Sequence, residues 1–385
     1  MKKATLYITA LIAGWFLFLC LLHYFSKRPL WLDERLLFEN IRDFSVAQLF
    51  GPLKNTQVFP RAYLALIKLI SQPFSYNALA LRLLPLVFML AGFFVWLKIY
   101  RLSAKAALFL VILLFSFASS HFTTYYAAEF KQYSCDLFAT GVFVLFIIYQ
   151  GKFADGDNLL RKLWFFSIIS PFLLFFSYIS ALLMWIVAYN YFLLLRKGRK
   201  LAAPFIAYSA IAVACCILLY FFDIRFSLGN QSMHDYWKDY FISTQSTYEF
   251  MKSLTEGIRN ITVRWYLEKK WAMGIATVFM PFCWVAIVKY CISSFRKHKG
   301  ALVDLDALCA ILLSEVFLLG ILQMYPFTGC RATLFIAPFI FYMIVKGIYL
   351  FERIKFVFYP LIGAYIILLS AVSWNLAIEY LKLYV

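Results

Sequence analysis

Residues 202–222 read AAPFIAYSAIAVACCILLYFF and contain no charged side chain. A helix of about 20 apolar residues is long enough to cross the roughly 30 Å hydrocarbon core of a bilayer. The whole chain has this character, because 64% of its 385 residues are hydrophobic and only 15% are charged. So few polar residues cannot cover so large an apolar core in water. The composition therefore excludes a soluble enzyme, a disordered chain and a secreted disulfide scaffold, and predicts a polytopic helical membrane protein.

We predict an all-α fold in which residues 1–385 form a single transmembrane domain of about eleven membrane-spanning helices. The first apolar run lacks a small-residue cleavage site, so we expect a retained span rather than a signal peptide. Residues 62–74 are only partly apolar and predict a helix at the membrane interface or a partly re-entrant segment. The expected spans are residues 6–25, 83–100, 104–122, 134–150, 163–179, 181–195, 202–222, 271–291, 303–323, 332–350 and 357–376.

The distribution of charge predicts the orientation of these spans. The formal net charge is +18, and the basic residues gather in alternate loops, which the positive-inside bias places in the cytoplasm. We therefore expect a multi-pass protein of the cell membrane with a cytoplasmic N-terminus. Membrane-surface phosphates are the expected partners of the basic residues, and nucleic acid is not expected. The basic loops are residues 98–105, 152–162, 196–200, 296–299 and 353–355.

Two long loops then lie on the outer side. Residues 26–82 are expected to form interfacial helices that carry an acidic motif, Asp33-Glu34. Residues 223–270 are polar and aromatic, and predict one or two surface helices that roof a cavity. The first loop holds the densest polar cluster of the chain, and the functional residues are therefore sought on the outer face.

Asp33 and Glu34 are adjacent, so on a helix they point about 100° apart. One carboxylate can then face a cavity while the other faces water or lipid headgroups. A carboxylate at the boundary of the apolar region suits a general base. The alternative interpretation is a solvated acidic start of a helix, where acids also interact well with the helix dipole.

Two further polar clusters lie at the same predicted membrane boundary. Glu129 and Tyr133 are one helical turn apart, with Lys131 between them, and charged groups so close to an apolar run usually face a cavity. The alternative is interfacial snorkelling beside an aromatic belt. Tyr325 begins a Pro/Gly turn that delivers Arg331 to the outer start of a span. A guanidinium there suits phosphate binding, although a lone interfacial arginine also serves as an anchor.

Other polar residues near the spans are less informative. Glu315 lies inside an expected span, and we predict that it pairs with a lysine or arginine of a neighbouring helix. Most cysteines lie inside apolar runs, where a free thiol behaves as a small hydrophobe. Cys135 and Cys330 lie near outer ends of spans, and whether they form a disulfide is left open.

The three clusters occur in an order that resembles a known family. Asp33-Glu34 follows the first span, and an "AE-x-K-x-Y" element runs from Ala128 to Tyr133. A "YP…R…LF…P" element then contains Tyr325-Pro326, Arg331, Leu334-Phe335 and Pro338. Residues 57–64, with Arg82-Leu83, are similar to the family's "PPLYY…RLP" segment, except that a single Pro60 replaces the proline pair. The chain thus resembles the GT-C superfamily of membrane glycosyltransferases. Within it, the family 39-like group of protein mannosyltransferases and the lipid A aminoarabinose transferase is the most similar.

The resemblance implies inverting transfer of a sugar from a polyprenyl-phosphate carrier to a lipid, glycan or protein acceptor on the outer face of the membrane. It implies that Asp33, or secondarily Glu34, is the catalytic base. Arg331 and Lys131, with Arg61 as a weaker candidate, would bind the donor phosphate. Glu129, Tyr133 and Tyr325 would contact the substrates. Some relatives hold a divalent metal on the first-loop acids and others do not, so a metal is left open and no other cofactor is expected.

Two other classes of protein compete with this interpretation. A transporter or flippase for lipid-linked glycans should carry its charges near the bilayer midplane, where Glu315 is the main example. A non-catalytic membrane assembly subunit would have no need to bring Asp33, Glu129 and Arg331 together. We therefore expect these three side chains to line one outward-facing cavity.

Overall fold

In the computed structural model, residues 3–26, 28–104, 106–153, 159–228, 231–266, 269–297 and 302–384 are described. Over these ranges the chain forms helices, turns and loops without a strand, which confirms the all-α prediction. Parts of the basic loops 98–105, 152–162 and 296–299 lie outside the described residues. The α-helices are α1 (Lys3–Tyr24), α2 (Leu32–Asp43), α3 (Arg61–Ser71), α4 (Ala78–Ser103), α5 (Ala107–Ala118), α6 (His121–Tyr125), α7 (Tyr133–Phe153), α8 (Leu160–Ile169), α9 (Ser180–Arg196), α10 (Ala202–Phe222), α11 (Gln231–Trp237), α12 (Thr247–Val263), α13 (Lys270–Thr277), α14 (Met280–Lys297), α15 (Leu305–Ile321), α16 (Ala337–Tyr349) and α17 (Lys355–Leu381).

Six helices in the described residues are long and apolar enough to cross a membrane. They are α1, α4, α7, α10, α17 and α16 together with the 3₁₀ helix η8 (Arg331–Ile336) that precedes it. Two bent pairs raise the number to eight: α5 with α6, bent by 57°, and α13 with α14, bent by 42°. These lengths and compositions indicate a membrane protein.

The predicted number of about eleven spans is not supported. The expected span at residues 163–179 is divided into α8, of 10 residues, and a 3₁₀ helix, η5 (Ser170–Phe175), with Pro171 near its start. The expected spans at 181–195 and 303–323 become α9 and α15, each of 17 residues. At about 1.5 Å per residue, these helices are shorter than the roughly 30 Å of hydrocarbon.

Helices α7 and α16 form the centre of the molecule. Within their most apolar segments, 83% and 89% of the residues are buried, against 28% in α1 and 22% in α10. Helix α7 packs closely on α4, because Gly92 leaves room for Leu137 and the Trp96 indole donates to the Leu137 carbonyl over 3.2 Å. Small residues at such contacts let apolar helices approach one another closely.

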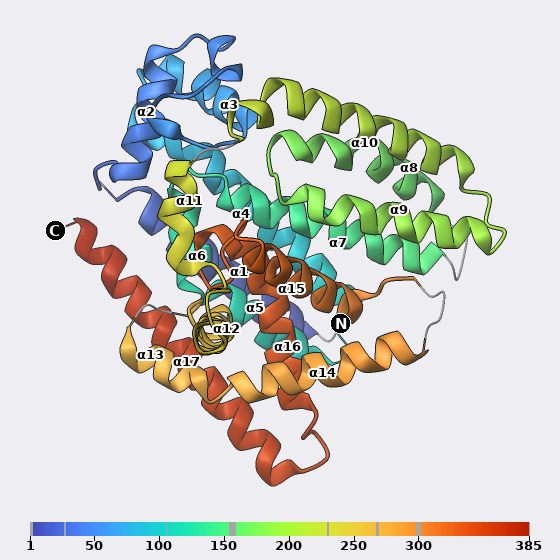
Figure 1. Cartoon of the computed structure of the whole chain (residues 1–385). Helices are drawn as coiled ribbons and strands as arrows, with labels where there is room; N and C mark the ends of the chain where they lie inside the picture. Colours follow the sequence, from blue (N-terminus) through green and yellow to red (C-terminus); the bar gives the residue numbers. More distant parts are fainter. Residues whose placement is uncertain are drawn as a thin grey trace.

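The long helices give the molecule two ends, at left and right in Figure 1. At one end, which we call the Asp33 end, lie α2, α3 and α11. At the other, the Lys197 end, lies the turn between α9 and α10. The 21 residues of α7 run from Tyr133 to Phe153, a length of about 30 Å. Long-range polar contacts at the Asp33 end join the segments that carry the predicted site residues.

Candidate functional site

Three segments that are far apart in the sequence meet at the Asp33 end. The Oδ2 atom of Asp33, in the first turn of α2, lies 2.7 Å from Nη2 of Arg331 and 3.9 Å from Nζ of Lys131. Arg331 begins η8, and Lys131 lies just before α7. The side chains of Asp33, Arg331 and Lys131 are 19%, 12% and 7% exposed, respectively. One partly accessible carboxylate is therefore held between two cations.

The approach of η8 to this cluster depends on Gly329. A Cβ atom at this position would lie 2.1 Å from the Asn260 carbonyl oxygen of α12. No side chain fits at that distance, so glycine permits the close contact between the turn before Arg331 and α12. The position of Arg331 is thus coupled to a helix of the second long loop.

Aromatic rings surround the Arg331 guanidinium. Its Cζ atom lies 4.9 Å from the centroid of Trp31, and 5.8 Å and 5.7 Å from those of Tyr236 and Trp237 on α11. The predicted substrate residue Tyr133 contributes a fourth ring at 6.0 Å. The guanidinium also donates to the Tyr236 hydroxyl over 2.8 Å. Cation–π contacts and this hydrogen bond hold the fork in one orientation.

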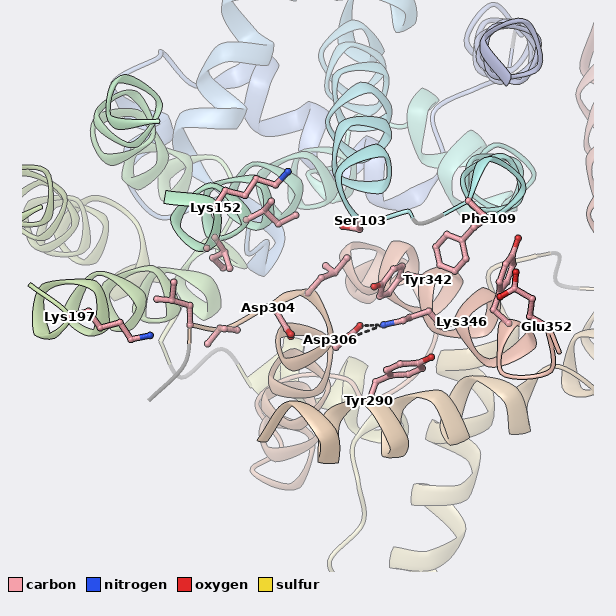
Figure 2. Close-up of a pocket in the computed structure, with 18 residues that line it drawn as sticks. Ser103, Phe109, Lys152, Lys197, Tyr290, Asp304, Asp306, Tyr342, Lys346 and Glu352 are labelled. Carbon is pink, nitrogen blue, oxygen red and sulfur yellow. Dashed lines mark hydrogen bonds and ion pairs between the residues drawn. The ribbon is translucent and has the colours of Figure 1, made fainter. Parts of the chain in front are cut away.

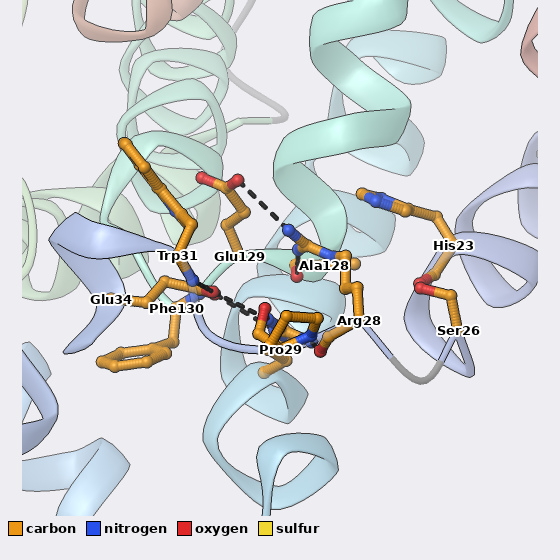
Figure 3. A network of polar contacts seen from close by, with 10 residues as sticks. His23, Ser26, Arg28, Pro29, Trp31, Glu34, Ala128, Glu129 and Phe130 are labelled. Atoms are coloured by element: carbon orange, nitrogen blue, oxygen red, sulfur yellow. Dashed lines mark hydrogen bonds and ion pairs between the residues drawn. The ribbon is translucent and has the colours of Figure 1, made fainter. Parts of the chain in front are cut away.

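Glu34 is placed differently from Asp33. Its side chain is fully buried, and Arg82 of α4 donates to both of its oxygens, over 3.1 Å from Nε and 2.7 Å from Nη2. The backbone N–H groups of Phe130 and Trp31 donate to the same carboxylate (Figure 3). Four donors therefore occupy Glu34, which leaves Asp33 as the accessible carboxylate of the pair. Breaking such a buried ion pair typically costs about 3–5 kcal/mol.

Glu129 is buried beside Arg28, whose Nη1 lies 3.4 Å from its Oε1. Arg28 also donates to the Ala128 carbonyl, as Figure 3 shows, and lies over the Tyr125 ring. Burial raises the pKa of Glu129 to about 7, although the nearby Arg28 opposes this shift. Burial likewise lowers the pKa of Lys131 to about 8, against the opposing charge of Asp33. Burial thus shifts the pKa of both groups toward the neutral range.

Two predicted site residues do not join the cluster. Arg61 is buried in an ion pair with Asp223 at the end of α10, with 3.5 Å between Nε and Oδ1, and the Tyr178 hydroxyl donates to the same carboxylate. The hydroxyl of Tyr325 donates to the Ala332 carbonyl. Tyr325 thus holds the turn around Arg331 instead of facing Asp33. Arg61 therefore lies outside the Asp33 cluster, and its role as a ligand of the donor phosphate stays a prediction.

Sequence reasoning missed four residues, of which three contact Arg331 and one, Arg28, contacts Glu129. Arg28 follows the first span at the end where basic residues are unexpected, and this position was a usable signal. Trp31, Tyr236 and Trp237 contact Arg331. The aromatic character of residues 234–240 was visible in the sequence, but only the packing of α11 reveals its partner.

Two predictions on individual residues concern Glu315 and the cysteines. Glu315 accepts a hydrogen bond of 2.6 Å from the Trp185 indole of α9, whereas the sequence predicted a basic partner. This hydrogen bond from the indole N–H takes the place of the predicted ion pair. Cys135 and Cys330 are both buried free thiols.

A divalent metal does not fit the Asp33 cluster. In the described part of the chain, no three His, Cys, Asp or Glu side chains are grouped in a way that could hold a metal ion. Asp33 instead faces two cationic side chains, which would repel a metal. Mg²⁺ and related ions prefer several oxygen ligands, and the described residues around Asp33 offer one accessible carboxylate.

Comparison of the chain with family models, curated proteins and solved structures finds no match. The resemblance to the GT-C superfamily therefore rests on the motif residues alone.

Proposed function

We propose that the chain transfers a sugar from a polyprenyl-phosphate donor to an acceptor hydroxyl at the Asp33 end, on the outer face of the membrane. The observation that supports this most directly is the Asp33 carboxylate held between Arg331 and Lys131. The reaction needs a base for the acceptor hydroxyl and cations for the lipid phosphate, and both occur here at the boundary of apolar helices. The acceptor would be a lipid, a glycan or a protein.

In the proposed reaction, Asp33 accepts the proton of the acceptor hydroxyl. The acceptor oxygen then forms a bond to the anomeric carbon, and the bond from that carbon to the polyprenyl phosphate breaks with inversion. The electron pair of the broken bond stays on the lipid phosphate, whose developing charge Arg331 and Lys131 stabilise. When no donor is bound, the Asp33 carboxylate balances the positive charge of Arg331 and Lys131.

The aromatic side chains of α11 support binding of an acceptor above this cluster. Tyr236 is 55% exposed and reaches Arg331 with its hydroxyl. Tyr and Trp combine apolar area with a polar group and suit the mixed surface of a glycan or lipid headgroup. Glu129 would hold Arg28 in position through their ion pair, and Arg28 would in turn hold the loop before α2.

Transport of a lipid-linked glycan is the second candidate function. The two bent helix pairs favour it, because discontinuous helices are typical of transporter substrate sites. The location of the charged residues favours glycosyl transfer, because Asp33, Lys131 and Arg331 gather at one end of the helices.

Asp33→Asn tests the proposal. Membranes that contain this variant should lose transfer of labelled hexose or aminopentose from polyprenyl phosphate, by at least about a hundredfold, because the general base is absent. The amide should leave the protein folded and able to bind polyprenyl phosphate. Asp43→Asn, on an exposed acid of the same helix, is the matched control and should retain activity. Full activity of Asp33→Asn would exclude this residue as the base, and flux of intact donor without transfer would favour the transporter.

A further inference from the structure

Glu315 is an acidic residue in the interior of an apolar helix, and in the described part of the chain it has no basic partner. Helix α15 runs from Leu305 to Ile321, so Glu315 lies about 15 Å from its start and about 9 Å from its end. The Trp185 indole donates to Oε1, and Oε2 has no hydrogen-bond partner. Ionisable side chains inside apolar helices usually pair with one another. The Glu315 carboxylate is therefore one half of an ion pair.

The carboxylate lies at a surface that α9 and α15 share. The hydrogen bond from Trp185 joins the two helices at this point. Asn190 of α9 also accepts from the backbone N–H of Val303, just before α15. Trp185 is 48% exposed and Glu315 is only partly buried. The surface around Glu315 is therefore accessible from outside the molecule.

Exposed apolar side chains flank Glu315 on both helices. They are Trp185, Tyr189 and Phe192 on α9, and Leu318 and Leu322 on α15. Their spacing of three or four residues puts each set on one side of its helix. Lipid chains can cover these apolar faces, but they carry no group that pairs with a carboxylate. An apolar helix with one cationic side chain matches both the apolar faces and the charge.

A second copy of the chain matches this surface less well. Lys289, which is exposed in the middle of α14, is its candidate cation. The neighbouring ring of Tyr290 lies 3.8 Å from Nζ of Lys346, which pairs with Asp306 (Figure 2). Asp306 is in the first turn of α15, about 14 Å along the helix from Glu315. Copies in one membrane share one orientation, so Lys289 of a second copy lies at a different depth from Glu315.

We propose that the surface of α9 and α15 around Glu315 binds a membrane-spanning helix of a partner protein, and that this helix carries a lysine or arginine midway along its length. The cationic group pairs with the Glu315 carboxylate, and the Trp185 ring adds a cation–π contact. The apolar side chains of the partner helix pack on the exposed faces of α9 and α15. Packing and polar contacts drive the association of helices in lipid, where the hydrophobic effect does not. This inference does not depend on the proposed glycosyl transfer.

Model helices test the proposal. Biotinylated leucine helices of about 20 residues carry lysine, glutamine or leucine at the centre, and the purified full-length chain is titrated onto them in detergent. The lysine helix should bind about tenfold more tightly than the leucine helix, which is the size of effect expected for a polar contact between helices. Equal binding of these two helices would overturn the proposal. A helix with its lysine near one end should lose the advantage, and an advantage kept there would show attraction to surface charge instead.

Variants assign the effect to this surface. Glu315→Gln should remove the preference for the lysine helix, and its amide oxygen can still accept from Trp185. Glu352→Gln changes an exposed acid outside the surface and is the matched control, which should keep the preference. Leu318→Asn should weaken binding of all three helices alike, because it interrupts the apolar face of α15. If Glu352→Gln and Glu315→Gln behave alike, or if Leu318→Asn has no effect, the proposed surface is wrong.

The oligomeric state of the chain distinguishes a partner protein from a second copy. Light scattering of the wild type in detergent should show a monomer. A dimer that both Glu315→Gln and Lys289→Gln dissociate would assign the cation to a second copy and overturn the choice of a partner protein.

Discussion

Three carboxylates at the Asp33 end have different surroundings, and these surroundings separate their roles. Glu34 is fully buried and accepts from four donors, so it stabilises the fold. Glu129 is buried against Arg28, a residue of the segment before α2. Asp33 is 19% exposed and faces Arg331 and Lys131. Accessibility, rather than residue type, thus assigns the proposed chemistry to Asp33.

Arg331 should act mainly on the lipid-phosphate donor. Replacing it by Ala removes charge-assisted hydrogen bonds worth about 1.5–3 kcal/mol, so the KM for donor should rise roughly 10- to 100-fold. Arg331→Lys keeps the charge but not the planar fork, and its KM should lie between those of Ala and wild type. Steady-state kinetics with varied donor and fixed acceptor measures both variants. An unchanged donor KM in Arg331→Ala would mean that this residue only anchors the helix.

Glu129 predicts a pH-dependent stability. Its pKa is raised from 4.5 to about 7 in the folded chain, so between these values the folded state binds a proton that the unfolded state has lost. The wild type should therefore lose stability as the pH rises from about 4.5 to about 7, by on the order of 3 kcal/mol. Glu129→Gln removes this contribution. Thermal denaturation of both proteins at pH values from about 5 to 7.5 measures it, and parallel curves would contradict the assignment.

At the scale of elements, close contacts between helices depend on glycines. A Cβ at Gly347 of α16 would lie 2.1 Å from the Phe282 carbonyl oxygen of α14, whereas a Cβ at Gly363 of α17 meets no atom within 4 Å. Both glycines lie inside helices. The pair therefore separates the effect of packing from that of helix propensity.

Gly347→Ala should force α14 and α16 apart and destabilise the protein by about 1–3 kcal/mol. Gly363→Ala should instead stabilise it slightly, by up to about 1 kcal/mol, because alanine is the better helix former. The midpoint of thermal denaturation in detergent compares the two variants. Equal midpoints would show that the α14–α16 contact is looser than the structure indicates.

At the scale of the whole molecule, the long helices place the Asp33 cluster and the Lys197 end about one membrane thickness apart. Helix α10 connects them directly, since it begins just after Lys200 and ends at Phe222, and the next residue, Asp223, pairs with Arg61. The positive-inside bias predicts that the Lys197 end is cytoplasmic. This arrangement predicts that the two ends differ in their accessibility from outside the cell.

Cysteine labelling checks this orientation. A membrane-impermeant maleimide should label Ser45→Cys, in the turn after α2, on intact cells. It should label Lys200→Cys only after permeabilisation, because that residue precedes α10. The unmodified chain supplies the background signal. The reverse pattern would place the Asp33 cluster in the cytoplasm, and labelling of both variants from outside would contradict a membrane span between them.

The class of this protein was predictable from its sequence alone, because apolar runs and loop charges are local properties. The spans at α1, α4 and α10 were recognisable for this reason, as was the presence of polar clusters around Asp33, Glu129 and Arg331. The number of spans was not predictable, because hydropathy does not show where a helix ends. Helices α8, α9 and α15 are shorter than the apolar runs that contain them.

The partners of the polar side chains were decided only by the tertiary structure. Asp33 and Glu34 are adjacent acids in the sequence, and nothing there shows that Asp33 pairs with Arg331 whereas Glu34 is buried against Arg82. Likewise, the contact of α11 with Arg331 and the separation of Arg61 from the cluster depend on how distant segments pack. Local sequence sets the preferences of single elements, whereas long-range contacts arise from the packing of whole helices, and these contacts determine the site.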